Sequence, residues 1–328
     1  MIASENDADY LDGLNTCHTE WASACGNDRN WLNVEGVQAQ SFLQRLLTSD
    51  ITALAEGKGQ WSALLNRKGQ WIADLLVFRL HESTFIIDHP AICSEGILST
   101  LEKAHFEEDV RWTLEDWQRT LILGPKNTAA LAQFQANMSP PPSELTIAPF
   151  CDEGWILGRP DMGAPCLEIC TPRDNTSELK DNLHALQKIS VGPLVLEALR
   201  ISSFIPRFGK EFSSETILPE TGEWRRTSQS KGCYVGQEVV ARVRTYGESP
   251  WKICGLEFES THPLEGMRLT DSEDKEIGHV TSWALSPKHE KSTGLGRIRR
   301  KAARKDNRIF AMRKDEKITT RVEPLSRT

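Results

Sequence analysis

The 328-residue chain has no apolar run that approaches the roughly 20 residues a membrane-spanning helix needs. Its N-terminus has early acidic residues and lacks the basic and apolar regions of a signal peptide. Its eight cysteines are too sparse for a disulfide framework, and no two of them form a Cys-x-x-Cys pair. These absences predict a cytoplasmic protein with reduced thiols and no membrane contact.

The common motifs of phosphate, dinucleotide and metal chemistry are missing as well. No GxxxxGK[ST], GxGxxG, HExxH or GxSxG segment occurs, and no Cys and His residues have the spacing of a zinc site. Cys166 and Cys170 lie in one apolar segment, where burial on one face of a strand explains them and a metal role is the alternative. We therefore predict no resident metal ion.

The net charge of −7 hides an uneven distribution along the chain. Residues 288–328 hold 14 Lys and Arg against five Asp and Glu, which gives +9 for this end and −16 for the rest. Such a basic end either attracts RNA through sequence-independent electrostatics or forms a solvated face of a folded domain.

Short strands and helices alternate irregularly, which predicts a mixed α+β fold. The apolar spacing from Val37 to Leu47 indicates a one-sided helix, and Asn66-Arg67-Lys68-Gly69 indicates a hairpin turn. Three consecutive prolines mark an internal joint near 139–143, because proline neither continues a helix nor donates to a β ladder. Strands are expected at 31–34, 60–65, 71–80, 84–88, 110–114, 120–123, 145–150, 155–158 and 166–170, and further helices at 93–106, 126–137, 176–189 and 193–201.

Three regions are expected along the chain. Residues 1–30 form an acidic leader, and residues 31–247 form two α+β subdomains. Residues 248–328 form a small β-barrel with a basic end, because strands at 251–258, 267–270, 277–283 and 294–298 alternate with Pro, Gly and Asp turns.

Cys233 has the most unusual surroundings of the eight thiols. Lys231 precedes it by two residues, glycines flank it at 232 and 236, and Gln237-Glu238 begin a predicted helix. A nearby cation and a helix N-terminus favour the thiolate, which suits a nucleophile, a redox sensor or a soft-metal ligand. The alternative is a tight turn in which the glycines give backbone freedom and Cys233 fills space.

The segment Lys231-Gly232-Cys233-Tyr234-Val235-Gly236-Gln237-Glu238 resembles the KGCYxGQE signature of the YgfZ/GcvT-like family of folate-binding proteins. The resemblance extends over most of the chain after residue 30, including 34–50, 66–70, 215–219 and 277–282. It implies a T-protein-like fold, in which two α+β subdomains and a C-terminal β-barrel surround a channel for tetrahydrofolate. It also implies a role in supporting the assembly or repair of iron–sulfur enzymes and, through them, tRNA modification.

The resemblance further implies roles for particular residues. The catalytic candidates are Cys233 and Lys231, with the lysine tuning the thiol, and the cofactor-binding candidates are Asp74, Arg200, Tyr234, Gln237 and Glu238. Within an apolar strand, Asp74 either faces the pterin or caps a backbone group. Arg200 either binds a folate carboxylate or forms an ion pair within the protein.

Three functions follow from these observations. The first is a folate-binding accessory protein whose partners are folate and iron–sulfur client or assembly proteins. The second is a folate-dependent one-carbon transferase of the aminomethyltransferase type, although Ala73 and Ala164 replace carboxylates that T-proteins carry. The third is an RNA-binding module that makes weak contacts through 288–328.

Overall fold

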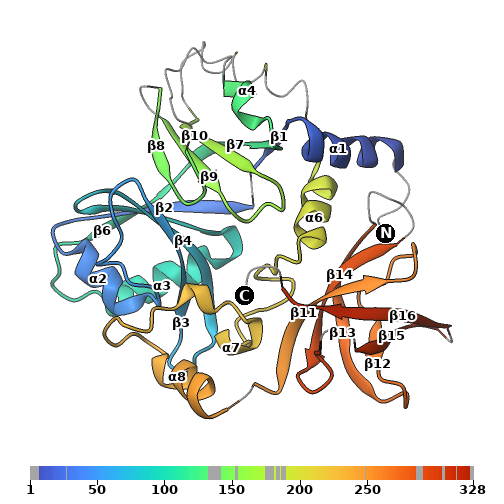
Figure 1. Cartoon of the computed structure of the whole chain (residues 1–328). Helices are drawn as coiled ribbons and strands as arrows, with labels where there is room; N and C mark the ends of the chain where they lie inside the picture. Colours follow the sequence, from blue (N-terminus) through green and yellow to red (C-terminus); the bar gives the residue numbers. More distant parts are fainter. Residues whose placement is uncertain are drawn as a thin grey trace. The chain divides into compact units, whose positions relative to one another are not determined.

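The computed structural model describes residues 7–26, 28–131, 142–151, 154–173, 181, 185, 190–247, 249–285, 291–304, 307–314 and 316–325. The chain divides into two compact units. A barrel unit comprises Met1–Leu14, Pro193–Trp224 and Glu238–Thr328, and a two-sheet unit comprises Asn15–Gly192 and Arg225–Gln237. The fold is α+β, as predicted, with two five-stranded sheets in one unit and a closed barrel in the other (Figure 1).

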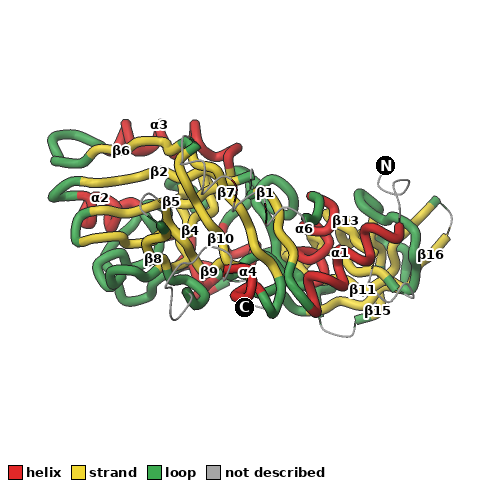
Figure 2. Tube along the Cα trace, turned by 90° about the horizontal axis from the view of Figure 1, so that it is seen from above, coloured by secondary structure: helices red, strands yellow, loops and turns green. Residues whose placement is uncertain are grey.

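The first sheet of the two-sheet unit has the order β3-β4-β5-β2-β6 and is antiparallel throughout. Figure 2 shows β2, β4 and β5 side by side. Each strand expected here is confirmed with slightly different ends: β2 (Arg29–Glu35), β3 (Gly59–Leu65), β4 (Trp71–His81), β5 (Thr84–Pro90) and β6 (Arg111–Glu115).

Two helices belong to this half of the unit, α2 (Ala39–Leu46) and α3 (Ser94–Ala104). The one-sided helix is confirmed, because α2 buries the positions at helical spacing, Ala39, Phe42, Leu43 and Leu46. The hairpin between β3 and β4 is also confirmed. The Asn66 side-chain oxygen accepts from the backbone N–H groups of Lys68 and Gln70 at 2.9 and 3.1 Å, and Gly69 has φ 71°.

The second sheet has the order β1-β7-β10-β9-β8. Its strands are β1 (Ala22–Cys25), β7 (Trp117–Leu123), β8 (Ile147–Phe150), β9 (Gly154–Arg159) and β10 (Cys166–Pro172), and α4 (Asn127–Leu131) follows β7. Residues 1–30, expected as a leader, contain β1, helix α1 (Asp7–Thr19) and the start of β2. The rest of the helix expected at 126–137, the three prolines of the joint apart from Pro142, and most of 176–189 lie outside the described residues.

An apolar core joins the two sheets of this unit. It draws on β2 to β5 and on β8 to β10, with Trp31, Trp61, Leu76, Phe78, Ile86, Ile147, Leu157 and Cys170 as its buried members. Burial raises the pKa of the Cys170 thiol well above its usual range, and that of Cys166 as well. Both cysteines are buried on β10, and the described residues contain no group of three or more His, Cys, Asp and Glu side chains placed to hold a metal ion.

A buried ionic network also joins the two sheets. Asp88 of β5, with no exposed surface, accepts a hydrogen bond from Trp31 Nε1 at 3.0 Å and one from Arg159 Nη1 at 3.1 Å, and it pairs with Arg29 and Arg119. Arg119 and Arg159 both reach Glu168, at 2.6 and 2.7 Å. Burial by itself would raise the pKa of Asp88, but the three guanidinium groups hold it well below its usual range.

Replacing Asp88 tests how far the two-sheet unit depends on this network. Asp88→Asn leaves three buried arginines without their central counter-charge, and we expect it to lower the free energy of unfolding by about 3 to 5 kcal/mol in urea denaturation. The control is Asp116→Asn, which breaks an exposed pair with Arg173 and should cost less than about 1 kcal/mol. Equal losses in the two variants would contradict the central role of Asp88.

The barrel unit contains six antiparallel strands in the closed order β11-β14-β13-β12-β15-β16, orange to red in Figure 1. The strands are β11 (Trp251–Phe258), β12 (Arg268–Thr270), β13 (Glu276–Leu285), β14 (Ser292–Arg299), β15 (Arg308–Arg313) and β16 (Glu316–Glu323). The expected barrel is confirmed, but only the first four strands were identified from the sequence. The basic end, residues 288–328, therefore supplies all of β14, β15 and β16.

Three further helices complete the described elements, α6 (Pro193–Ser202), α7 (Leu218–Thr221) and α8 (Gln237–Tyr246), with single 3-10 turns at Ala91–Cys93 and Trp224–Arg226. Within the barrel unit, α6 lies against β13 and β14. No helix among the described residues is long and apolar enough to cross a membrane.

Candidate functional site

Lys231 fixes the first residue of the signature segment on the two-sheet unit. Its ammonium donates to the carbonyl oxygens of Gln44 at 2.6 Å and Ser49 at 3.0 Å, and also to that of Leu47. These carbonyls lie at the end of α2, where a helix leaves acceptors unpaired and favours a cation. Burial lowers the pKa of Lys231 to about 8, against the opposing effect of Asp50.

Gly236 fixes the other end of the segment on the β3–β4 hairpin. It has φ 81°, and a Cβ at this position would lie 2.5 Å from the carbonyl oxygen of Asn66 and 3.1 Å from Gly69 Cα. Glycine is therefore required both by the backbone conformation and by the close approach of the turn. Gly232 differs, because no heavy atom lies within 4 Å of a Cβ placed there.

Tyr234 and Gln237 form the turn that leads into α8. The Gln237 N–H donates to the Tyr234 carbonyl at 3.2 Å, and the Tyr234 N–H donates to Gln237 Oε1 at 3.3 Å. The Tyr234 ring is buried and lies 5.4 Å from the Lys231 ammonium. Tyr234 and Gln237 thus have structural contacts within the segment, and Glu238 is exposed at the start of α8. Their cofactor-binding roles stay predictions.

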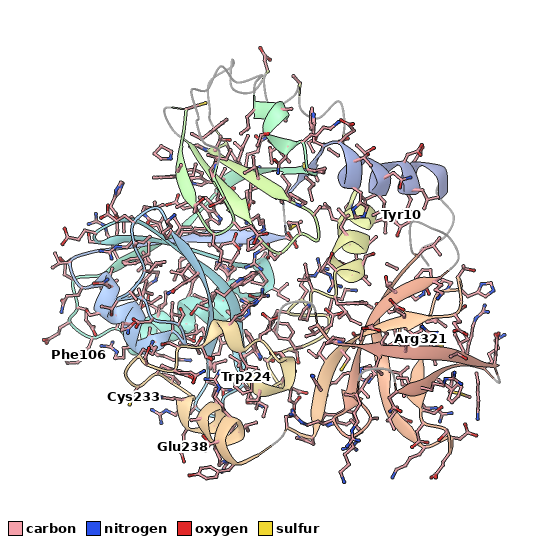
Figure 3. All side chains as sticks on the ribbon, viewed as in Figure 1. Tyr10, Phe106, Trp224, Cys233, Glu238 and Arg321 are labelled. Carbon is pink, nitrogen blue, oxygen red and sulfur yellow. The ribbon has the colours of Figure 1, made fainter. Side chains whose placement is uncertain are left out.

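Cys233 is exposed between these two anchors, and Figure 3 shows it near the edge of the molecule. Together with Gly232 and residues on and after α2, it lines a hollow of about 390 Å³, whose other members are Gln40, Ser41, Gln44, Arg45 and Thr52. Within the described residues, the Lys231 ammonium makes no hydrogen bond to the thiol, since it is directed at the end of α2. The signature segment therefore holds its cysteine at a fixed, solvent-open position.

Asp74 lies on β4 and is buried, as predicted from its apolar strand. Its Oδ1 is 2.7 Å from Arg226 Nη1, and its Oδ2 is 3.9 Å from Arg29 Nη1. The geometry at Arg226 is that of an ion pair without a hydrogen bond, so Asp74 Oδ1 is a buried acceptor with no hydrogen bond from the described residues.

Arg226 was not identified from the sequence, although it connects the returning segment to the sheet. It is 2% exposed and donates to the carbonyl oxygens of Ser62 and Leu75 at 3.2 and 3.1 Å. Its own carbonyl accepts from Thr48 Oγ1 at 2.6 Å, and its guanidinium lies 4.3 Å from the Trp61 ring. The sequence contains one indirect signal for Arg226, since a buried Asp74 needs a cation as its partner. The two residues are far apart in the sequence, so the pairing could not be predicted.

Arg200 lies on α6 in the barrel unit and is fully engaged there. All five N–H groups of its guanidinium donate to partners within that unit. Two bonds go to Glu197 at 2.7 and 3.1 Å, one to Glu211 at 2.9 Å, and the others to the Ile205 carbonyl and Ser282 Oγ. The internal ion-pair interpretation describes this geometry, and no donor is left over for a folate carboxylate.

The two glycines of the signature give a direct test of its anchoring. Gly236→Ala forces a Cβ against the hairpin backbone, so we expect it to lower the free energy of unfolding by at least about 2 kcal/mol and to speed proteolysis within 225–237. Gly232→Ala is the matched control and should change either quantity little, because the space around it is open. Similar behaviour of the two variants would contradict the anchoring role of Gly236.

Comparison with known proteins places this geometry in context. The family model of the GCVT N-terminal domain matches residues 29–151, and that of the glycine cleavage T-protein C-terminal barrel domain matches residues 252–326. An aminomethyltransferase of Chlorobium luteolum is 26% identical over 84% of this chain and 79% of its own length. One from Bacillus subtilis is 28% identical over 81% of this chain and 76% of its own length.

A solved structure shares the fold over nearly the whole chain. The aminomethyltransferase T of the glycine cleavage system from Bartonella henselae superposes with a TM-score of 0.89, covering 97% of this chain and 89% of that one, at 20% identity. At 20% sequence identity, this similarity establishes a shared fold and not a shared function.

Proposed function

We propose that this chain, which belongs to the GcvT-like family, is a folate-binding accessory protein that supports the assembly or repair of iron–sulfur enzymes. The observation that carries the proposal is the anchored signature segment, which leaves the Cys233 thiol exposed beside a hollow while Lys231 and Gly236 hold the backbone. A fixed and accessible thiol suits a transient bond to a cysteine or cluster of a partner. Through such client enzymes the protein influences tRNA modification.

A partner is required by the chemistry of cluster binding. Iron–sulfur clusters are held by about four protein ligands, and Cys233 supplies one. The described residues around Cys233 include no second cysteine lining the same hollow. The remaining ligands therefore come from the client or assembly protein, and Cys233 acts at the interface rather than as a resident cluster ligand.

Tetrahydrofolate is the ligand that the family implies. The candidate residues differ in whether they have a hydrogen-bonding group available for it. Asp74 is the better candidate, because no N–H of the described residues donates to its buried Oδ1 in hydrogen-bond geometry, although this oxygen is ion-paired with Arg226 at 2.7 Å. Arg200 does not fit, because its donors are all used within the barrel unit. When bound, tetrahydrofolate supplies a nitrogen that carries one-carbon groups, and Asp74 would orient the ring that bears it.

Calorimetric titration with tetrahydrofolate and its 5-formyl form tests the ligand. We expect wild-type protein to bind, and Asp74→Asn to weaken binding by at least about tenfold through loss of a charge-assisted hydrogen bond. Arg200→Gln is the comparison variant and should lower the melting temperature while leaving the folate Kd unchanged. Absence of binding by the wild type contradicts the ligand, and unchanged binding by Asp74→Asn contradicts the role of Asp74.

The role of the thiol is tested in a host strain that lacks its own protein of this kind. We expect Cys233→Ser to fail to restore the specific activity of an iron–sulfur enzyme with an oxidation-sensitive cluster. The control is Cys25→Ser, which removes another exposed thiol from the same unit and should restore activity as wild type does. Full restoration by Cys233→Ser, at equal protein level, contradicts the proposed role.

A second candidate function is one-carbon transfer on an amine carrier, favoured by the aminomethyltransferases similar to this chain over most of its length. The replacement of T-protein carboxylates by Ala73 and Ala164 weighs against it, since Ala73 is fully buried beside Asp74 and brings no proton-transfer group. Turnover of a methylene donor by the purified protein alone would favour the transferase over the accessory protein.

A further inference from the structure

The outer face of the barrel carries two arginines and a histidine in register across neighbouring strands. Arg268 of β12 pairs with His279 of β13, and His279 pairs with Arg297 of β14. Two residues farther along β14, Arg299 pairs with Trp251 of β11. Directly opposed residues of a sheet bring their side chains to about 5 Å on one face, so these groups form one continuous band.

The turn after β14 extends this band. Residues 291–304 contain six Lys and Arg and no carboxylate. The turn is fixed by backbone hydrogen bonds, since the Arg300 N–H donates to the Pro250 carbonyl and the Ala302 N–H to the Arg299 carbonyl, both at 2.9 Å. It presents Lys301 and Arg304, which are exposed. We call the whole set the basic face: Arg268, His279, Arg297, Arg299, Lys301 and Arg304.

Little negative charge within the barrel unit balances the basic face. Arg297 pairs with Glu220 at 2.9 Å, whereas Arg268, Arg299 and Lys301 have no carboxylate in salt-bridge distance among the described residues. The Trp251 ring instead holds two guanidinium groups, with Cζ of Arg299 at 4.1 Å and of Arg297 at 4.9 Å. The positive potential of these neighbouring side chains would attract a polyanion.

We propose that the basic face binds the phosphodiester backbone of a single-stranded RNA. Arginines dominate it, and the guanidinium group matches phosphate oxygens through paired hydrogen bonds. An embedded membrane helix or a stable protein interface would require apolar anchors as well. The large exposed apolar side chains among the described residues are Val37, Ile92, Phe106, Leu114, Leu194 and Tyr246, and none of them lies on a barrel strand.

The test measures binding of a labelled single-stranded RNA of mixed sequence to the full-length chain by fluorescence anisotropy, between about 50 and 200 mM salt. Each phosphate contact on a single strand adds about 0.7 to the magnitude of the slope of log K against log salt concentration. The triple variant Arg268→Gln, Arg299→Gln, Lys301→Gln removes three such contacts, so we expect it to reduce that magnitude by about 2. The matched control, Lys58→Gln, Lys103→Gln, Lys126→Gln, removes the same net charge from the two-sheet unit and should change it little.

Three outcomes would overturn the proposal. They are no RNA binding by the wild type at the lowest salt, an equal loss in the two triple variants, and binding to phosphatidylserine vesicles without binding to RNA. Thermal melting of all three proteins separates a loss of binding from a loss of folding, and the substituted side chains are exposed. Folate titration and the Cys233 variant report on the other proposal independently, because they involve the two-sheet unit.

Discussion

The buried charge network around Asp88 is the interaction on which the two-sheet unit depends. Four arginines and four carboxylates take part, so the network is neutral as a whole: Arg29, Arg119, Arg159, Arg226, Asp74, Asp88, Asp161 and Glu168. Burying any one of them alone would cost several kcal/mol by the usual desolvation argument. Each member therefore depends on its partners, and the pairs between Asp88 of one sheet and Arg119 and Arg159 of the other join the two sheets as their apolar core does.

The same network reaches the signature segment. Arg226 pairs with Asp74, Asp74 lies 3.9 Å from Arg29, and Arg29 pairs with Asp88. The returning chain at 225–237 is thereby connected to the interior through charge, and to the surface of the unit through Lys231 and Gly236. This double attachment explains how the segment 225–237 keeps Cys233 in a defined position on the two-sheet unit.

Sequence reasoning succeeded where structure follows a local period. Helix α2 and the β3–β4 hairpin were predicted because their apolar spacing and turn residues lie within a few positions of one another. Strands β15 and β16 were missed because they lie in the charge-rich end of the chain, although Ile309 and Ala311 alternate inward as a strand requires. The contacts of the buried charge network could not be predicted from local sequence patterns, because the partners lie far apart in the chain. Arg119 and Asp88 are 31 residues apart, and Arg226 and Ser62 are 164 residues apart.

The candidate site shows a second limit of sequence reasoning. The sequence identifies charged residues, but it does not show which of them already have hydrogen-bond or ion-pair partners within the protein. Lys231 binds backbone carbonyls, and backbone acceptors leave no mark in a sequence. Every donor of Arg200 is engaged, so a ligand could bind it only by displacing Glu197 or the buried Glu211. The Cys233 thiol is exposed, and Asp74 Oδ1, though ion-paired with Arg226, accepts no hydrogen bond from the described residues. Recognition in the two-sheet unit is therefore expected to rest on these two groups.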